Sequence, residues 1–145
     1  MKTTTSAEQT AQLGTELAAD LLPGDVILLS GDLGAGKTTF VQGLGRGLGV
    51  MQPIQSPTFT VIAEYRAILD GSVVTLAHLD LYRLEPGEAT FSAGVEDVLD
   101  RADTVAVIEW PDRLPMLPDA PIWRIGIRNI AADTRQITIE GPDRG

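Results

Sequence analysis

The sequence predicts an α/β domain with a mixed sheet, parallel at its centre and flanked by helices, and three features lead to this fold class. Two short runs, at 26–29 and 105–108, contain only apolar residues, which is typical of strands buried on both faces. A segment with helical spacing of apolar residues lies between them, as in proteins whose helices cover a parallel sheet. A hairpin signal and two late β-rich segments lack intervening helices, so antiparallel pairs are expected beside the parallel strands.

The first predicted element is a helix from about Ser6 to Leu22. Ser6 and Gln9 have the spacing of a capping box at its start. Apolar residues recur at helical spacing along one face, at Ala7, Ala11, Leu17, Ala18 and Leu21. Pro23 and Gly24 then end the helix before the first apolar strand.

A second helix is predicted at 37–48, after a glycine-rich loop, and Gly49 suits its end. Its inner face is expected to carry Phe40, Val41, Leu44 and Leu48. The β-rich segments 58–66 and 73–81 flank an Asp-Gly pair at 70–71, which predicts an antiparallel hairpin.

The later part of the chain predicts less regular structure. Residues 86–99 are typical of short helical pieces broken by a glycine, and two late strands are expected at 123–128 and 136–139. We expect residues 1–145 to form a single domain, in which 136–145 includes the last strand and a flexible tail.

The composition, 43% hydrophobic and 21% charged over 145 residues, is that of an ordinary soluble globular protein. No apolar run approaches the roughly 18 residues of a membrane span, and the first residues lack the apolar core of a signal peptide. The chain has no cysteine, which excludes disulfides, thiolate zinc sites and thiol nucleophiles and suits a cytoplasmic protein. With a single histidine, His78, any metal is expected to have oxygen ligands, which suits magnesium.

The formal net charge of -9 argues against direct contact with nucleic acid. Proteins that bind nucleic acid usually carry a basic patch, and none is visible in this sequence. If the protein serves a nucleic-acid pathway, we expect it to act through another protein.

The residues from Gly31 to Thr38 read GDLGAGKT and match the Walker A pattern G-x-x-x-x-G-K-[ST] at every fixed position. Glycines let backbone N–H groups approach an anion, and the helix that follows adds the positive end of its dipole. Lys37 brings a charge to the β- and γ-phosphates of a nucleotide, and Thr38 offers a hydroxyl to magnesium. The nucleotide-binding residues expected here are Leu33, Gly34, Ala35, Gly36, Lys37, Thr38 and Thr39.

Two acidic residues are candidates for the rest of a nucleotide-hydrolysing site, because ligands of α/β sheets bind at the carboxyl ends of strands. Glu109 directly follows the apolar run 105–108, as in the Walker B pattern, and is the stronger candidate for metal binding. Asp80, near the end of 73–81, either contacts the water shell of the metal or orients the attacking water. Its alternative role is a hydrogen bond to a turn or to Arg83.

Four other features are less specific. On its residues alone, the segment 56–60 is a loop that enters a strand, and Asp32 faces solvent. His78 fits a structural histidine better than a base. Trp110 either covers the nucleotide or packs on the core.

Four segments, GDLGAGKTT, SPTFT, HLDLYRL and IEWPDRL, occur in this order and together resemble the TsaE family, bacterial P-loop ATPases of tRNA threonylcarbamoyladenosine synthesis. The resemblance extends over residues 6–114. It implies a single P-loop domain that binds ATP with magnesium (Mg2+) and hydrolyses it slowly. It also implies work with a TsaB–TsaD pair, in which TsaD transfers a threonylcarbamoyl group to tRNA, so that tRNA is reached only through these partners.

The same resemblance implies roles for particular residues. The implied catalytic residues are Lys37, Asp80 and Glu109, and the implied magnesium-linked pair is Thr38 and Glu109. Thr10 would approach the nucleotide base, and 56–58 would belong to a switch-like segment. Which carboxylate positions the attacking water stays open, and 115–145 matches no motif.

Two other functions fit a phosphate-binding loop. A small-molecule or nucleoside kinase needs a lid with arginines, and the stretch 86–101 has few basic residues. A nucleotide-gated switch without catalysis would keep its partner function when hydrolysis is abolished.

Overall fold

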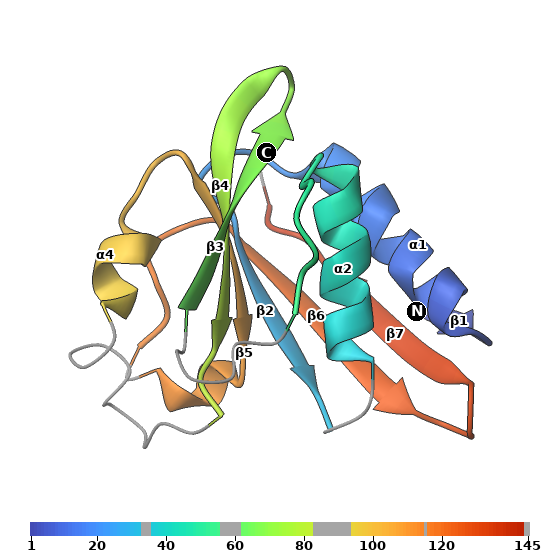
Figure 1. Cartoon of the computed structure of the whole chain (residues 1–145). Helices are drawn as coiled ribbons and strands as arrows, with labels where there is room; N and C mark the ends of the chain where they lie inside the picture. Colours follow the sequence, from blue (N-terminus) through green and yellow to red (C-terminus); the bar gives the residue numbers. More distant parts are fainter. Residues whose placement is uncertain (33–35, 56–61, 83–93, 115, 144–145) are drawn as a thin grey trace.

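The computed structural model describes residues 1–32, 36–55, 62–82, 94–114 and 116–143, and Figure 1 shows their arrangement. Among them, no helix combines the length and apolar character that crossing a membrane requires. The elements in chain order are β1 (Lys2–Thr4), α1 (Ala7–Leu17), η1 (Ala18–Asp20), β2 (Val26–Gly31), α2 (Lys37–Gly47), β3 (Ile62–Leu69), β4 (Ser72–Asp80), α4 (Val95–Leu99), β5 (Thr104–Glu109), η2 (Pro111–Arg113), β6 (Ile122–Asn129) and β7 (Arg135–Glu140).

The described strands form one seven-stranded sheet in the order β1-β7-β6-β2-β5-β4-β3. Its central strands β6, β2, β5 and β4 run parallel to one another. Antiparallel pairs lie on both sides, β3 with β4 at one edge and β6, β7 and β1 at the other. The predicted mixed sheet with a parallel centre is therefore confirmed.

Each face of the sheet carries its own buried cluster, because alternate strand residues point to opposite faces. On one face, Ile27 and Val107 belong to a cluster with Phe40 of α2. On the other, Ile108 belongs to a cluster with Val98 of α4. The predicted inner-face residues Phe40, Val41, Leu44 and Leu48 are all buried.

Helix α1 begins as predicted and ends earlier. The Ser6 hydroxyl accepts a hydrogen bond from the Gln9 N–H at 3.2 Å. The Gln9 side chain accepts from the N–H of Thr5 at 2.7 Å, one residue before the capping position. The α-helix stops at Leu17 and tightens into the 3-10 turn η1, a common helix ending. Ala7, predicted on the buried face, is exposed.

Helices α1 and α2 lie side by side on the same face of the sheet (Figure 1), and their backbones touch at Gly43. A Cβ atom at Gly43 would lie 1.8 Å from the carbonyl oxygen of Ala11. The Thr15 hydroxyl donates a hydrogen bond to the Gly43 carbonyl at 2.7 Å. This contact fixes α1 beside the helix that follows the glycine-rich loop.

The hairpin of β3 and β4 turns at Asp70 and Gly71, whose φ angles are 50° and 79°, as the Asp-Gly pair predicts. Strand β3 runs to Leu69, and its predicted start at 58 lies outside the described residues. Helix α4 follows Gly94, and the rest of the predicted segment 86–93 also lies outside them. Both late strands are confirmed, each slightly longer than predicted.

Strand β1 was not predicted. Its three residues contain no alternation of apolar and polar side chains that would indicate a strand. It forms because its backbone pairs with β7, with Lys2 opposite Ile137 and Thr4 opposite Arg135. The pairing brings the segment before α1 next to the last strand.

Candidate functional site

The glycine-rich loop leaves β2 at Gly31 and enters α2 at Gly36. Gly36 has φ 101° and ψ 17°, a left-handed conformation that suits glycine. Its carbonyl accepts a backbone hydrogen bond of α2 at 2.9 Å. The strand–loop–helix context of the Walker A pattern is therefore present. Leu33, Gly34 and Ala35 lie outside the described residues, and their part in the loop stays a prediction.

The Lys37 ammonium is buried among three electron-rich groups. Its Nζ donates to the Gly31 carbonyl at 2.8 Å and lies 3.9 Å from Glu109 Oε1. The centre of the Trp110 ring is 4.2 Å away, within the range of a cation–π contact. Lys37 thus connects the loop to the end of β5, and a phosphate would compete with these partners for its charge. Thr38 and Thr39 follow in the first turn of α2, and both are half-buried.

The two candidate carboxylates meet through the register of neighbouring strands. Asp80 of β4 is directly opposite Glu109 of β5. Glu109 also pairs with Leu29 of β2, two residues before the loop. Glu109 is buried and Asp80 is half-buried. The parallel centre of the sheet therefore brings both acids to the edge that carries Lys37.

Burial raises the pKa of the Asp80 carboxyl above its usual range, and the nearby Glu109 carboxylate raises it further. The Tyr82 N–H donates to Asp80 Oδ1 at 3.2 Å and opposes this shift, as do His78 and Lys37. The hydrogen bond to a turn, considered for Asp80 from the sequence, is therefore present at one oxygen. A carboxyl with a raised pKa beside a phosphate loop is typical of groups that exchange protons.

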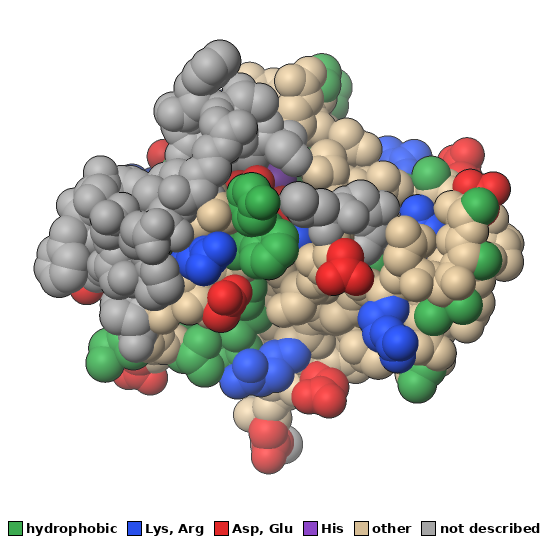
Figure 2. All heavy atoms as spheres, turned by 90° about the horizontal axis from the view of Figure 1, so that it is seen from below, with side chains coloured by type: hydrophobic (Ala, Val, Ile, Leu, Met, Phe, Trp, Pro, Cys, Tyr) green, Lys and Arg blue, Asp and Glu red, His purple; other side chains and the backbone are tan. Residues whose placement is uncertain are grey.

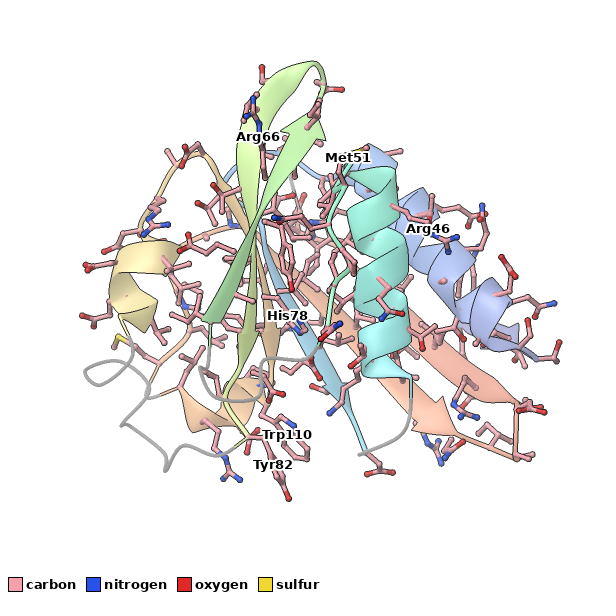
Figure 3. The ribbon with its side chains drawn as sticks, viewed as in Figure 1. Arg46, Met51, Arg66, His78, Tyr82 and Trp110 are labelled. Atoms are coloured by element: carbon pink, nitrogen blue, oxygen red, sulfur yellow. The ribbon has the colours of Figure 1, made fainter. Side chains whose placement is uncertain are left out.

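His78 is fully buried on β4, and its Nε2 lies 2.5 Å from Glu109 Oε2. The sequence favoured a structural role for this histidine, and the structure brings it into contact with a candidate site carboxylate. Its spacing of two residues from Asp80 is the signal that could have found it, since residues i and i+2 of a strand share one face. Figure 3 labels His78 on its strand above Tyr82 and Trp110.

Two aromatic rings border the same end of the sheet, as Figure 3 shows for Tyr82 and Trp110. Their centroids are 4.9 Å apart, with an angle of 47° between the planes. Trp110 has φ 60°, which is uncommon for a bulky residue. It packs against the second core cluster and against Lys37, so the core-packing interpretation holds, and covering of a nucleotide stays a prediction.

Thr10 lies beside the entry to α2. It is buried, its hydroxyl hydrogen-bonds with that of Thr4 at 2.7 Å, and its Cγ2 would be 3.8 Å from a Cβ atom at Gly36. A cavity of about 90 Å³ opens there, lined by Ser6, Ala7, Thr10, Gly36, Thr39, Asp133 and Arg135. Sequence reasoning missed Asp133 and Arg135, because no local motif reports that β7 returns beside the first residues of the chain.

Asp32 is exposed, as expected. Arg83 and the segment 56–58 lie outside the described residues. Figure 2 looks onto the carboxyl ends of the central strands, where acidic and basic side chains interleave around an apolar cluster.

A parallel strand that ends in a glycine-rich loop, a helix that starts with a buried lysine, and a carboxylate on the next strand define an α/β domain of the P-loop NTPase type. The model of the TsaE family, "Threonylcarbamoyl adenosine biosynthesis protein TsaE", matches residues 4–137. The chain therefore belongs to the TsaE family of tRNA threonylcarbamoyladenosine biosynthesis.

Individual relatives agree with this assignment. The TsaE protein of Nostoc sp. is 49% identical over 118 residues, which cover 79% of this chain and 70% of that protein. The TsaE protein of Treponema pallidum is 42% identical, with 92% of this chain and 95% of that protein covered. The crystal structure of Bacillus subtilis YdiB is similar in fold, with a TM-score of 0.66 and 34% identity over 98% of this chain and 84% of that one.

Proposed function

We propose that this chain binds ATP with magnesium on the loop from Gly31 to Thr38 and hydrolyses the ATP slowly, in support of a TsaB–TsaD pair. The observation that carries the proposal is the position of Lys37 Nζ, 2.8 Å from the Gly31 carbonyl and 3.9 Å from Glu109 Oε1. The lysine joins the phosphate loop to the acid that ends a neighbouring apolar strand, the two parts on which P-loop hydrolysis depends. Membership of the TsaE family supports the tRNA pathway.

The donor groups around the loop suit a magnesium ion that phosphates help to hold. Thr38 offers a hydroxyl and Glu109 a carboxylate, both hard oxygen ligands. Within the described ranges, no group of three or more His, Cys, Asp or Glu side chains is placed to hold a metal by itself. Magnesium is commonly held by one or two protein oxygens together with substrate phosphates, so this sparse set fits it. When bound, the ion offsets negative charge on the β- and γ-phosphates.

In the proposed reaction, water attacks the γ-phosphorus, the bond to the β–γ bridging oxygen breaks, and ADP and inorganic phosphate leave. Lys37 exchanges its contact with the Gly31 carbonyl for phosphate oxygens and stabilises the charge that develops there. Asp80 orients the attacking water and accepts its proton, a role that its raised pKa suits. Glu109 would help to hold the magnesium ion.

We place the nucleotide base beside Thr10, at the cavity of about 90 Å³. The cavity adjoins Gly36 and Thr39 and is therefore next to the phosphate loop. Its size suits the edge of a base, with Arg135 and Asp133 as the nearby charged groups. The Thr10 hydroxyl is engaged with Thr4, so Thr10 contributes a wall to this subsite.

The partners proposed from the family are TsaB and TsaD in the cytoplasm, with tRNA reached only through them. The net charge of -9 and the interleaved charges at the site end of the molecule (Figure 2) support an indirect route to tRNA.

The test is ATP hydrolysis by the purified protein with magnesium, alone and with TsaB and TsaD. Lys37→Ala and Glu109→Ala are compared with Glu16→Ala, an exposed glutamate on α1 that serves as the control. We expect weak hydrolysis that rises with the partners, is lost in the first two variants and survives in the third. If the partners change nothing and a small acceptor gains phosphate from ATP, the protein is a kinase and the proposal is wrong.

A further inference from the structure

His78 occupies a strand position where the pattern of its neighbours predicts an apolar side chain. Alternate residues of β4 face helices α1 and α2, and Val74 and Leu76 in this row belong to the buried cluster. His78 is next in the row, with 0% of its surface exposed. Burying an imidazole costs free energy unless its polar atoms are hydrogen-bonded, so a hydrogen-bond partner is expected beside His78.

That partner is Glu109. Its Oε2 lies 2.5 Å from His78 Nε2, and within the part of the chain that the structure describes, His78 Nδ1 has no hydrogen-bond partner. An ionised carboxylate only accepts hydrogen bonds, so this contact with an ionised Glu109 requires the proton to be on Nε2. The polar chemistry of the imidazole is therefore directed at one carboxylate.

The two oxygens of Glu109 have different partners. Oε2 contacts His78 on β4, and Oε1 lies 3.9 Å from Lys37 Nζ on the loop side. Holding one oxygen fixes the rotation of the carboxylate about its last bond. The other oxygen is thereby kept facing the phosphate loop.

We infer that His78 is a positioning residue, which orients the Glu109 carboxylate toward Lys37 and toward the magnesium ion of the proposed nucleotide complex. The inference rests on the proposed function, because it explains how Glu109, a proposed magnesium-binding group, is oriented. Groups that hydrogen-bond a metal-binding carboxylate set its direction, and their loss typically weakens metal binding about 10–100-fold.

The test compares His78→Leu with His78→Gln. Leucine fills a similar volume without a donor, whereas the glutamine amide can donate from nearly the same place as Nε2. The probe is a fluorescent, non-hydrolysable ATP analogue. Its affinity is first measured in the presence of a chelator, and the magnesium concentration for half-saturation is then measured at fixed analogue. Thermal unfolding without magnesium monitors the fold, and His78→Met replaces the leucine variant if that one does not fold.

We expect His78→Leu to raise the half-saturating magnesium concentration about 10–100-fold. The affinity for the ATP analogue measured in the presence of the chelator should not change. His78→Gln should restore most of the loss. A folded leucine variant with the magnesium dependence of the wild type would overturn the inference, and so would an equal loss in both variants. If the wild type itself binds no analogue, the proposed function fails as well, which separates the two results.

Discussion

The contact between α1 and α2 at Gly43 leads to a sharp prediction for Gly43→Ala. The new Cβ atom would lie 1.8 Å from the Ala11 carbonyl oxygen and 2.5 Å from its carbon, and real Cβ atoms essentially never approach closer than 3.0 Å. Helix α1 must therefore move by at least 1.2 Å, the difference between 1.8 and 3.0 Å. The movement also strains the hydrogen bond from Thr15 to the Gly43 carbonyl.

The cost follows from two opposing effects. Overpacking costs about 1–3 kcal/mol where side chains adjust, and a clash with backbone lies at the upper end of that range. Alanine is favoured over glycine inside a helix by roughly 0.5–1 kcal/mol. We expect a net loss of about 2 kcal/mol in the free energy of unfolding. For a domain of this size, that loss lowers Tm by roughly 6–8 °C.

The assay is thermal unfolding followed by circular dichroism, with Arg46→Ala as the control on the exposed side of the same helix (Figure 3). The control should stay within about 0.5 kcal/mol of the wild type. A Gly43→Ala protein as stable as the wild type would refute the close packing of the two helices. Because α1 carries Thr10, the variant should also bind the fluorescent ATP analogue more weakly.

Two further predictions concern the site. The raised pKa of Asp80 means that its ionised form destabilises the folded protein at neutral pH, and that this penalty disappears as the pH falls through the folded-state pKa toward the usual carboxyl range. Asp80→Asn should therefore unfold at a higher urea concentration than the wild type at pH 7 and lose this advantage near about pH 4. The variant should also hydrolyse no ATP. Lower stability than the wild type at pH 7 would contradict the direction of the Asp80 pKa shift. Gly36→Ala and Gly71→Ala place alanine at φ angles of 101° and 79°, where a Cβ meets nothing closer than 3.8 Å, so each should cost about 1–2 kcal/mol of stability. Only Gly36→Ala should weaken binding of the fluorescent analogue in a titration, and equal binding by the two variants would count against a role of Gly36 in the loop.

The parts of the molecule that local pattern could predict are those whose signal lies within a few residues. The apolar runs that became β2 and β5, the Asp-Gly turn and the start of the helix at Lys37 all follow from short-range chemistry. The meeting of Asp80 and Glu109 was predictable as well, because parallel strands bring their carboxyl ends to one edge of a sheet.

The parts that could not be predicted depend on contacts between distant segments. Strand β1 forms because β7 pairs with it. Its three polar residues alone give no signal of a strand. For the same reason, the sequence did not predict that Asp133 and Arg135 line the cavity beside Thr10. The spacing of His78 from Asp80 could have indicated a shared face, but the contact of His78 with Glu109 depends on the register between two strands, which periodicity does not supply.

Because β1 pairs with β7, the region before α1 is completed by residues that are synthesised much later than its own. Gly36 leaves the ribosome about 100 residues before Arg135, an interval of roughly 5–20 s at the usual rates of translation. Throughout that interval the nascent chain has its phosphate loop and Lys37, yet lacks the wall that β7 contributes beside Thr10. Under the proposed function, the subsite for the nucleotide base is therefore complete only after β7 has been synthesised.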